Sequence, residues 1–142
     1  MELTSELNKL VKEKCIMLDL ELREYIKCSK EEKRDCLPLI EEIVGWAEMA
    51  VKGGLLDLED EVIGVKNQLL KTGMSLVIDG CESEIVKSVM DDMIVASGKT
   101  GVELLRQLIV REGVLSIQSG YNPRIIELRL SAMLGEEIFA DG

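Results

Sequence analysis

The sequence predicts an all-α fold, a soluble antiparallel bundle of about six helices. Apolar residues recur at three- and four-residue spacing along most of the chain, the period of an amphipathic helix. No segment shows the sustained alternation of a half-buried strand, and no hairpin dipeptide separates two apolar runs. The chain has 142 residues, of which 46% are hydrophobic and only 3% aromatic, with two prolines. These values predict one domain with an aliphatic core.

The first half of the chain divides into two predicted helices. Apolar positions between residues 3 and 28 predict an amphipathic N-terminal helix, and Ser29-Lys30-Glu31-Glu32 has the pattern of a capping box that restarts a helix. A second helix is expected from near Cys36, because Pro38 fits a first turn, to Gly53-Gly54. Its inward stripe comprises Leu37, Ile40, Ile43, Val44, Ala47 and Val51.

The second half predicts shorter segments joined by turns. A helical segment over 55–78 contains Gly64 and Gly73, and a kink or break is expected near either glycine. The segment 83–95 follows, then a loop over Ala96–Lys99. Thr100-Gly101-Val102-Glu103 predicts a second capping box, which opens a helix that continues through Leu115. The last helix is predicted over Pro123–Leu134, with Asn122 as its N-cap and a frayed tail beyond it.

Predicted inward positions in these segments follow the same three-to-four spacing. Those of 55–78 are Leu55, Leu58, Val62, Val65, Leu69, Leu76 and Val77. Those of 83–95 are Ile85, Val86, Val89, Met90, Met93 and Ile94. The last helix carries Ile125, Ile126, Leu128, Leu130 and Leu134.

A weak internal repeat relates two parts of the chain. The paired positions are Gly73 with Gly113, Gly80 with Gly120, Ile85 with Ile125, Val86 with Ile126, and Met90 with Leu130. Each copy has a glycine, an apolar stretch, a second glycine and a new amphipathic segment. Two helix–glycine–helix units therefore predict paired helices.

Composition narrows the classes of function. The net charge is −10, which argues against binding to nucleic acid or to anionic membranes and favours a basic partner, or simply solubility. No apolar run is long enough to span a bilayer and the N-terminus is charged, so we expect a cytoplasmic protein without membrane insertion. With no histidine, Ser-His and Cys-His nucleophile pairs are impossible. We expect no enzyme activity and no cofactor.

Three patterns in the sequence resemble ligand sites. Ser97-Gly98-Lys99-Thr100 resembles the end of a phosphate-binding loop but lacks the preceding glycine and strand. Carboxylates gather at Asp57–Glu61 and at Asp91-Asp92, which leaves a metal- or ligand-binding acidic helical protein as an alternative. A structural zinc site would need all four cysteines at unusual spacings, and reduced thiols are favoured. These cysteines are Cys15, Cys28, Cys36 and Cys81.

Three segments resemble the flagellar stator protein MotA, within the MotA, TolQ and ExbB proton-channel family. They are Gly54–Glu59 (GLLDLE), Leu70–Gly80 (LKTGMSLVIDG) and Glu112–Leu134 (EGVLSIQSGYNPRIIELRLSAML). The resemblance implies a MotA-like cytoplasmic helical domain without transmembrane helices. In this interpretation residues 1–36 replace the first two membrane helices, 37–95 form the first family-like segment, 96–101 replace the other two, and 102–135 form the second.

The resemblance also implies partner-binding residues. In the family, a basic residue before the GLL-x-LE element and the glutamate that ends it are implicated in contacts with the rotor protein FliG. Here these positions correspond to Lys52, displaced by one, and Glu59. The leading hypothesis is a non-catalytic protein that acts through protein–protein contacts, with FliG or other motor proteins as partners. Met90 and Met93 are candidates for an apolar anchor, although core packing is favoured. The alternative is a self-associating helical module, a homo-oligomer with no motility role.

Overall fold

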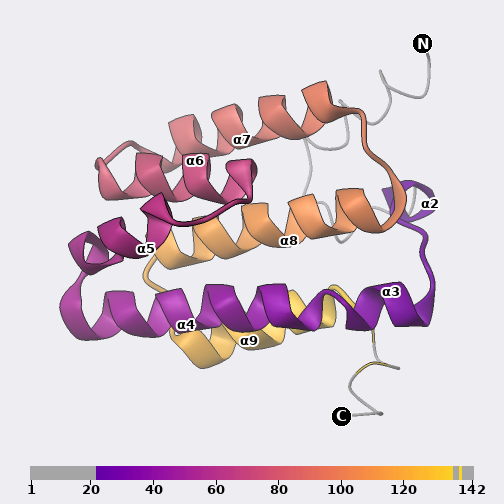
Figure 1. The fold of residues 1–142 in the computed structure, drawn as a ribbon, viewed down its shortest axis with the longest axis horizontal. Helices are drawn as coiled ribbons and strands as arrows, with labels where there is room; N and C mark the ends of the chain where they lie inside the picture. The colour runs from indigo at the N-terminus through magenta and orange to yellow at the C-terminus, as the bar shows by residue number, and fades with distance from the viewer. Residues whose placement is uncertain (1–21, 136–137, 139–142) are drawn as a thin grey trace.

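The computed structural model describes residues 22–135 and residue 138. This part of the chain is helical and contains no strand, which confirms the predicted all-α bundle (Figure 1). The elements in chain order are α2 (Leu22–Tyr25), α3 (Lys30–Arg34), α4 (Leu37–Gly53), the 3-10 helix η2 (Leu55–Leu58), α5 (Glu59–Ile63), α6 (Gln68–Ile78), α7 (Ser83–Ser97), α8 (Gly101–Gln118) and α9 (Pro123–Ala132). The helix expected over 3–28 and the frayed tail lie mostly outside the described residues.

Helix α8 lies at the centre of the bundle, with α4 and α9 on one side and the α6–α7 hairpin on the other (Figure 1). Helices joined by a tight turn run antiparallel, as in α6–α7 and α8–α9, whereas α4, α6 and α8 run in the same direction. The position of α8 explains its high burial: ten of its residues are buried. None of the described helices combines the length and the apolar character that crossing a membrane would require.

The core is aliphatic, as the composition predicts. Residues with no more than 2% exposure come from every long helix, and they include Ile43, Leu58, Leu70, Met74, Met90, Ile94, Leu104, Leu105, Leu108 and Ile109. Met90 therefore packs in the core and is excluded as a surface anchor, and Met93 is only partly exposed. Trp46, the one tryptophan, is also buried.

Local signals set the ends of α3 and α4. Ser29 Oγ accepts from the amide of Glu32 at 3.1 Å, and the Glu32 carboxylate accepts from the amide of Ser29 at 3.0 Å. This reciprocal pair confirms the predicted capping box. Helix α4 begins directly after Cys36, with Pro38 in its first turn, and ends at Gly53. Its C-cap is Gly54, whose φ of 89° is a conformation that glycine adopts without strain. Both boundaries were predicted.

The segment 55–78 breaks at one of its two glycines only. Helix α5 ends at Gly64, and α6 restarts after Asn67, whose side chain accepts from the amide of Leu70 at 3.1 Å. Gly73 stays inside α6 and is buried against Met90. A glycine inside a helix costs stability through chain entropy, and here it permits close packing of α7 on α6.

The internal repeat corresponds to two equivalent helical hairpins, α6–α7 and α8–α9. Gly80 and Gly120 adopt φ of 82° and 76°. The amide after each glycine donates a hydrogen bond back to the first helix of the hairpin. The Cys81 amide donates to the carbonyl of Leu76 at 3.1 Å, and the Tyr121 amide donates to that of Ser116 at 3.3 Å. These are Schellman turns at equivalent positions. The paired residues Val86 and Ile126, and Met90 and Leu130, are fully buried.

The junction between α7 and α8 is shorter than predicted. The expected loop over Ala96–Lys99 was wrong at its start, because α7 continues through Ser97 and ends at Gly98 in the left-handed conformation. Thr100 occupies the N-cap position of α8, but its side chain makes no capping hydrogen bond, so the predicted capping box is wrong. Helix α8 also continues beyond Leu115 to Gln118.

Four residues predicted to face inward are exposed instead. Val51 is 66% exposed, Ile85 52%, Ile125 47% and Leu128 49%. Each lies on a helix at the edge of the bundle, where no described element covers that side of the helix. Periodicity identifies the apolar side of a helix, but it does not determine how much of that side a neighbouring helix will cover.

Caps differ in their expected contribution to stability. Asn122 Oδ1 accepts from the amide of Arg124 at 2.8 Å, so Asn122→Ala should lower the free energy of unfolding by about 1 kcal/mol. Thr100→Ala is the matched control and should change it much less, because Thr100 makes no such bond. Urea unfolding of both variants measures the difference, and equal losses would contradict the assigned caps.

Candidate functional site

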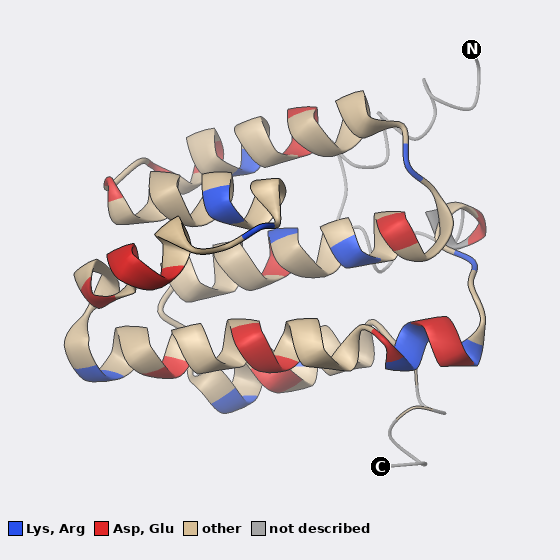
Figure 2. Cartoon of the chain, viewed as in Figure 1, with Lys and Arg blue, Asp and Glu red and all other residues tan. Residues whose placement is uncertain are grey.

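Lys52 and Glu59 lie at the same end of the bundle. Lys52 is in the last turn of α4 and Glu59 opens α5, with Gly53, Gly54 and η2 between them. Both side chains are exposed. Figure 2 shows a basic residue at the end of α4 and acidic residues on α5 beside it. A lysine at a helix C-terminus and a glutamate at a helix N-terminus each suit the helix dipole, which stabilises them where they stand.

The connection between these two residues is held tightly. A Cβ atom on Gly53 would stand 1.6 Å from Asp57 Oδ2, so the carboxylate of η2 folds directly over the end of α4. The Gly54 amide donates to the carbonyl of Ala50 at 2.9 Å. Leu58 and Val62 are buried beneath this connection. The two glycines thus allow η2 to turn back against α4 and present the intervening side chains outward.

Three large apolar side chains surround Lys52 and Glu59 in the sequence and are open to solvent. Val51 is 66% exposed, Leu56 69% and Ile63 70%, the highest values among the large hydrophobic residues that the structure describes. We name the exposed set Val51, Lys52, Leu56, Glu59, Asp60 and Ile63 the acidic end. Exposed apolar groups among charges are typical of protein-contact surfaces.

A second cluster of charges has a buried centre, Asp91 and Arg111, and the sequence did not predict it. Arg111 Nε donates to Asp91 Oδ1 at 2.5 Å, and both residues are at most 3% exposed. Lys87 Nζ lies 2.8 Å from Asp91 Oδ2 on the same helix. Arg111 also contacts Glu112 at 2.6 Å. The signal available in the sequence was Arg111 itself, a charge that directly follows the apolar run Leu108-Ile109-Val110 of α8.

This cluster continues onto α9. Glu112 Oε2 lies 3.2 Å from Arg129 Nη2, and the Arg129 guanidinium stacks over the ring of Tyr121 at 5.4 Å. Charges of opposite sign alternate along the whole chain of contacts from α7 to α9. Each buried charge therefore has a partner, which is what a low-dielectric interior requires. These contacts link the α6–α7 hairpin to the α8–α9 hairpin, which is a structural role.

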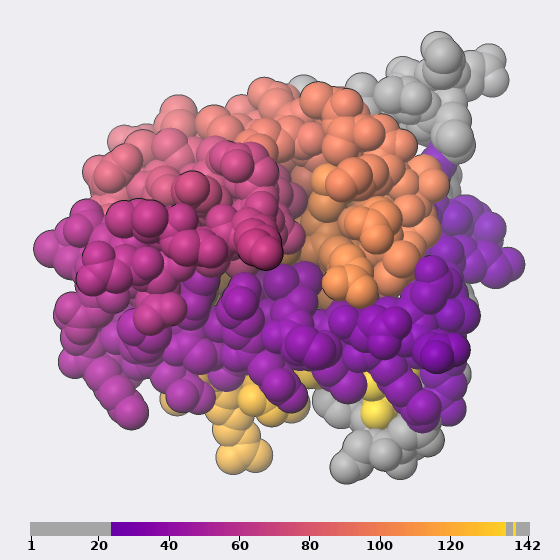
Figure 3. Space-filling view, viewed as in Figure 1, coloured from indigo at the N-terminus to yellow at the C-terminus, as the bar shows by residue number. Residues whose placement is uncertain are grey.

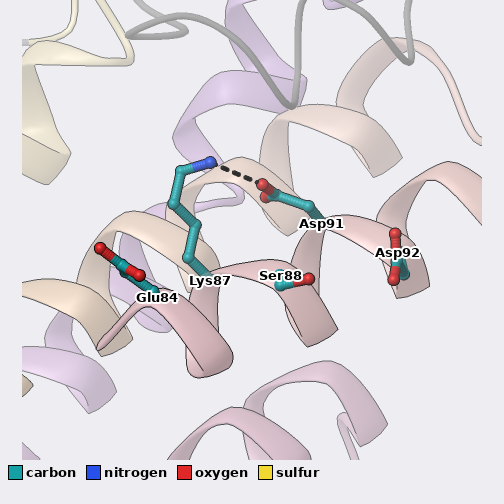
Figure 4. A pocket seen from close by; sticks show the side chains of 5 residues that line it. All are labelled: Glu84, Lys87, Ser88, Asp91 and Asp92. Atoms are coloured by element: carbon teal, nitrogen blue, oxygen red, sulfur yellow. Dashed lines mark hydrogen bonds and ion pairs between the residues drawn. The ribbon is translucent and has the colours of Figure 1, made fainter. Parts of the chain in front are cut away.

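A shallow pocket lies along α7 beside this cluster. Its volume is about 380 Å³, and it is lined by Glu84, Lys87, Ser88, Asp91 and Asp92 (Figure 4). The close-up shows Lys87 extended toward Asp91, whereas Asp92 lies apart from them. The two neighbouring carboxylates of the sequence are thus separated. No group of three or more potential metal ligands occurs in the described part of the chain.

The described cysteines are free thiols. Cys36 is fully buried and its Sγ donates to the carbonyl of Glu32 at 3.5 Å. Burial raises the pKa of Cys36, and burial likewise raises the pKa of Cys28. A raised pKa keeps a thiol protonated at neutral pH and makes it a poor nucleophile or metal ligand. Cys15, one of the four cysteines that a structural zinc site would need, lies outside the described residues.

Comparison with known proteins identifies partial relatives of this chain. It is 36% identical over 52 residues to motility protein A of Borreliella burgdorferi, and 32% identical over 62 residues to motility protein A of Bacillus subtilis. It is also 40% identical over 58 residues to the protein YtxD of Bacillus subtilis. The matches cover 37%, 44% and 41% of this chain.

These matches define a limited relationship. They span 20%, 22% and 21% of the three relatives' own lengths, about a fifth in each case. No family model matches the chain. Part of the chain is therefore similar in sequence to motility protein A.

Proposed function

We propose that this protein is a non-catalytic, MotA-like helical module that acts in motility through protein–protein contacts made by the acidic end. The observation that carries the proposal is the exposure of Lys52 and Glu59 beside the most exposed large hydrophobic residues described. The partial similarity to motility protein A supports a motility-related role. The resemblance to MotA makes the rotor protein FliG the partner to test first.

Charge and apolar area contribute differently to such a contact. Exposed ion pairs contribute about 0.2–1 kcal/mol each, so Lys52 and Glu59 set orientation and partner choice more than affinity. Leu56 and Ile63 supply the apolar surface that a stable contact needs. They take the role of apolar anchor for which Met90 is a candidate in the sequence. An interface residue that fills a partner's pocket contributes more than 1 kcal/mol. The acidic end therefore contains both parts of a binding surface.

Calorimetric titration with the purified torque-generating domain of FliG tests the proposal. We expect binding in the micromolar range, weakened by Lys52→Glu and Glu59→Lys because each reverses a contact charge. Leu56→Gln should weaken binding about fivefold or more, since it removes an exposed apolar anchor. Lys99→Glu and Glu42→Lys are matched controls, as both residues are exposed but lie outside the acidic end. They should bind as the unaltered protein does.

Two results would refute this function. One is the absence of any binding up to high micromolar concentration of both proteins. The other is equal loss in the control variants, which would attribute binding to net charge rather than to a defined surface. Circular dichroism of each variant confirms that the fold is retained.

A further inference from the structure

A second exposed apolar surface lies on α9. Ile125 and Leu128 are 47% and 49% exposed, Ala132 is exposed, and Tyr121 just before the helix is 44% exposed. Positions 125, 128 and 132 follow helical spacing and form one stripe. In the space-filling view, α9 projects beyond α4 at the lower edge of the molecule (Figure 3). This stripe remains open although Ile126 and Leu130 on the same helix are fully buried.

Arginines flank the stripe on both sides. With 100° per residue, Arg124 lies beyond Leu128 on one side and Arg129 lies beyond Ile125 on the other. The positive charge of Arg129 is partly compensated by Glu112, whose Oε2 lies 3.2 Å from Arg129 Nη2. The guanidinium of Arg124 makes no ion pair with a described residue. We name Tyr121, Arg124, Ile125, Leu128, Arg129 and Ala132 the α9 face, a basic surface on an acidic protein.

The acidic end has the opposite arrangement. By the same helical geometry, Ile63 projects between Glu59 and Asp60 on α5. Its exposed fraction is 70%, and Leu56 of η2 is similarly open. Each surface thus has an apolar centre bordered by charge, basic on α9 and, apart from Lys52, acidic at the other end. The two surfaces are complementary in charge and alike in apolar character.

We propose that the α9 face of one copy binds the acidic end of a second copy in a head-to-tail contact. Symmetric pairing of two α9 faces is disfavoured, because antiparallel packing centred on Ile125 and Leu128 would gather the Arg124 side chains of both copies along one flank and the Arg129 side chains along the other. Pairing of two acidic ends would gather the carboxylates of Glu59 and Asp60 from both copies, and Lys52 would offset them only in part. The unlike pairing places Arg124 and Arg129 of one copy against Glu59 and Asp60 of the other, around the apolar contacts. Such a heterologous contact leaves one free surface of each kind on a dimer.

Sedimentation velocity of the protein alone, from low micromolar to millimolar concentration, tests this contact independently of any rotor binding. The unaltered protein should associate progressively, and more weakly as salt is raised. Arg124→Glu/Leu128→Gln removes the α9 face, and Asp60→Arg/Ile63→Gln removes part of the acidic end. Each variant alone should self-associate at least about tenfold more weakly than the unaltered protein. Lys99→Glu should associate as the unaltered protein does.

Mixing the two variants gives the decisive result. Each retains one intact surface, so an equimolar mixture should form dimers and no larger species. A strictly monomeric unaltered protein would overturn the proposal. So would association of the Asp60→Arg/Ile63→Gln variant by itself, which would indicate symmetric pairing through α9. Failure of the mixture to dimerise, with both variants folded by circular dichroism, would overturn it as well.

Discussion

Replacement of Arg111 by methionine should lower the free energy of unfolding by about 3 kcal/mol, the largest effect expected from a single substitution in this protein. Arg111 and Asp91 form a buried ion pair at 2.5 Å between α8 and α7. Asp91 is 2% exposed, and without the guanidinium its carboxylate would keep Lys87, at 2.8 Å, as a cationic partner. The penalty arises because the buried carboxylate is then compensated only in part, by the 39% exposed side chain of Lys87, rather than from loss of a net favourable pair.

A double variant separates these two causes. Asp91→Leu/Arg111→Met removes both charges and should recover most of the lost stability, since well-packed apolar pairs often equal or exceed buried ion pairs. Urea unfolding of the single and double variants gives the coupling energy between the two side chains. If the double variant were as unstable as the sum of both single variants, the pair would not be coupled and the assigned cause would be wrong.

The sequence predicted the helix boundaries best where local chemistry alone determines them. The Ser29 capping box, the start of α4 before Pro38 and the N-cap Asn122 each depend on a few adjacent residues. The glycine turns at Gly80 and Gly120 were predictable for the same reason, since both require a positive φ. Thr100 had the right pattern but its side chain makes no capping bond, so the pattern permits a cap without enforcing it.

Features that depend on distant residues were not predictable from spacing. Asp91 and Arg111 are 20 positions apart and meet only because α7 packs on α8. Ile125 and Leu128 are apolar residues on an amphipathic helix, and their exposure depends on how much of α9 its neighbours cover. Lys52 and Glu59 could be assigned to the surface, but the identity of a binding partner also depends on the chemistry of another molecule.

Gly113→Ala should destabilise the protein by about 1–3 kcal/mol, although alanine is the better helix former. A Cβ atom on Gly113 would stand 2.7 Å from Ile43 Cγ2 and 3.5 Å from Leu130 Cδ1. Ile43 is a fully buried, β-branched residue of α4 and has little freedom to move. The glycine is therefore required where α4, α8 and α9 meet.

Two other glycines serve as matched controls in the same measurement. Gly73→Ala should cost less than Gly113→Ala, because the nearest atoms belong to the flexible end of Met90, at 2.7 and 2.9 Å. Gly45→Ala should stabilise the protein by about 0.5–1 kcal/mol, since nothing lies within 4 Å of the new Cβ and the helix gains propensity. Thermal unfolding of the three variants should thus rank Gly45→Ala above the unaltered protein, then Gly73→Ala, then Gly113→Ala. Any order in which Gly113→Ala is the most stable would mean that α4 and α8 do not pack as closely as the structure shows.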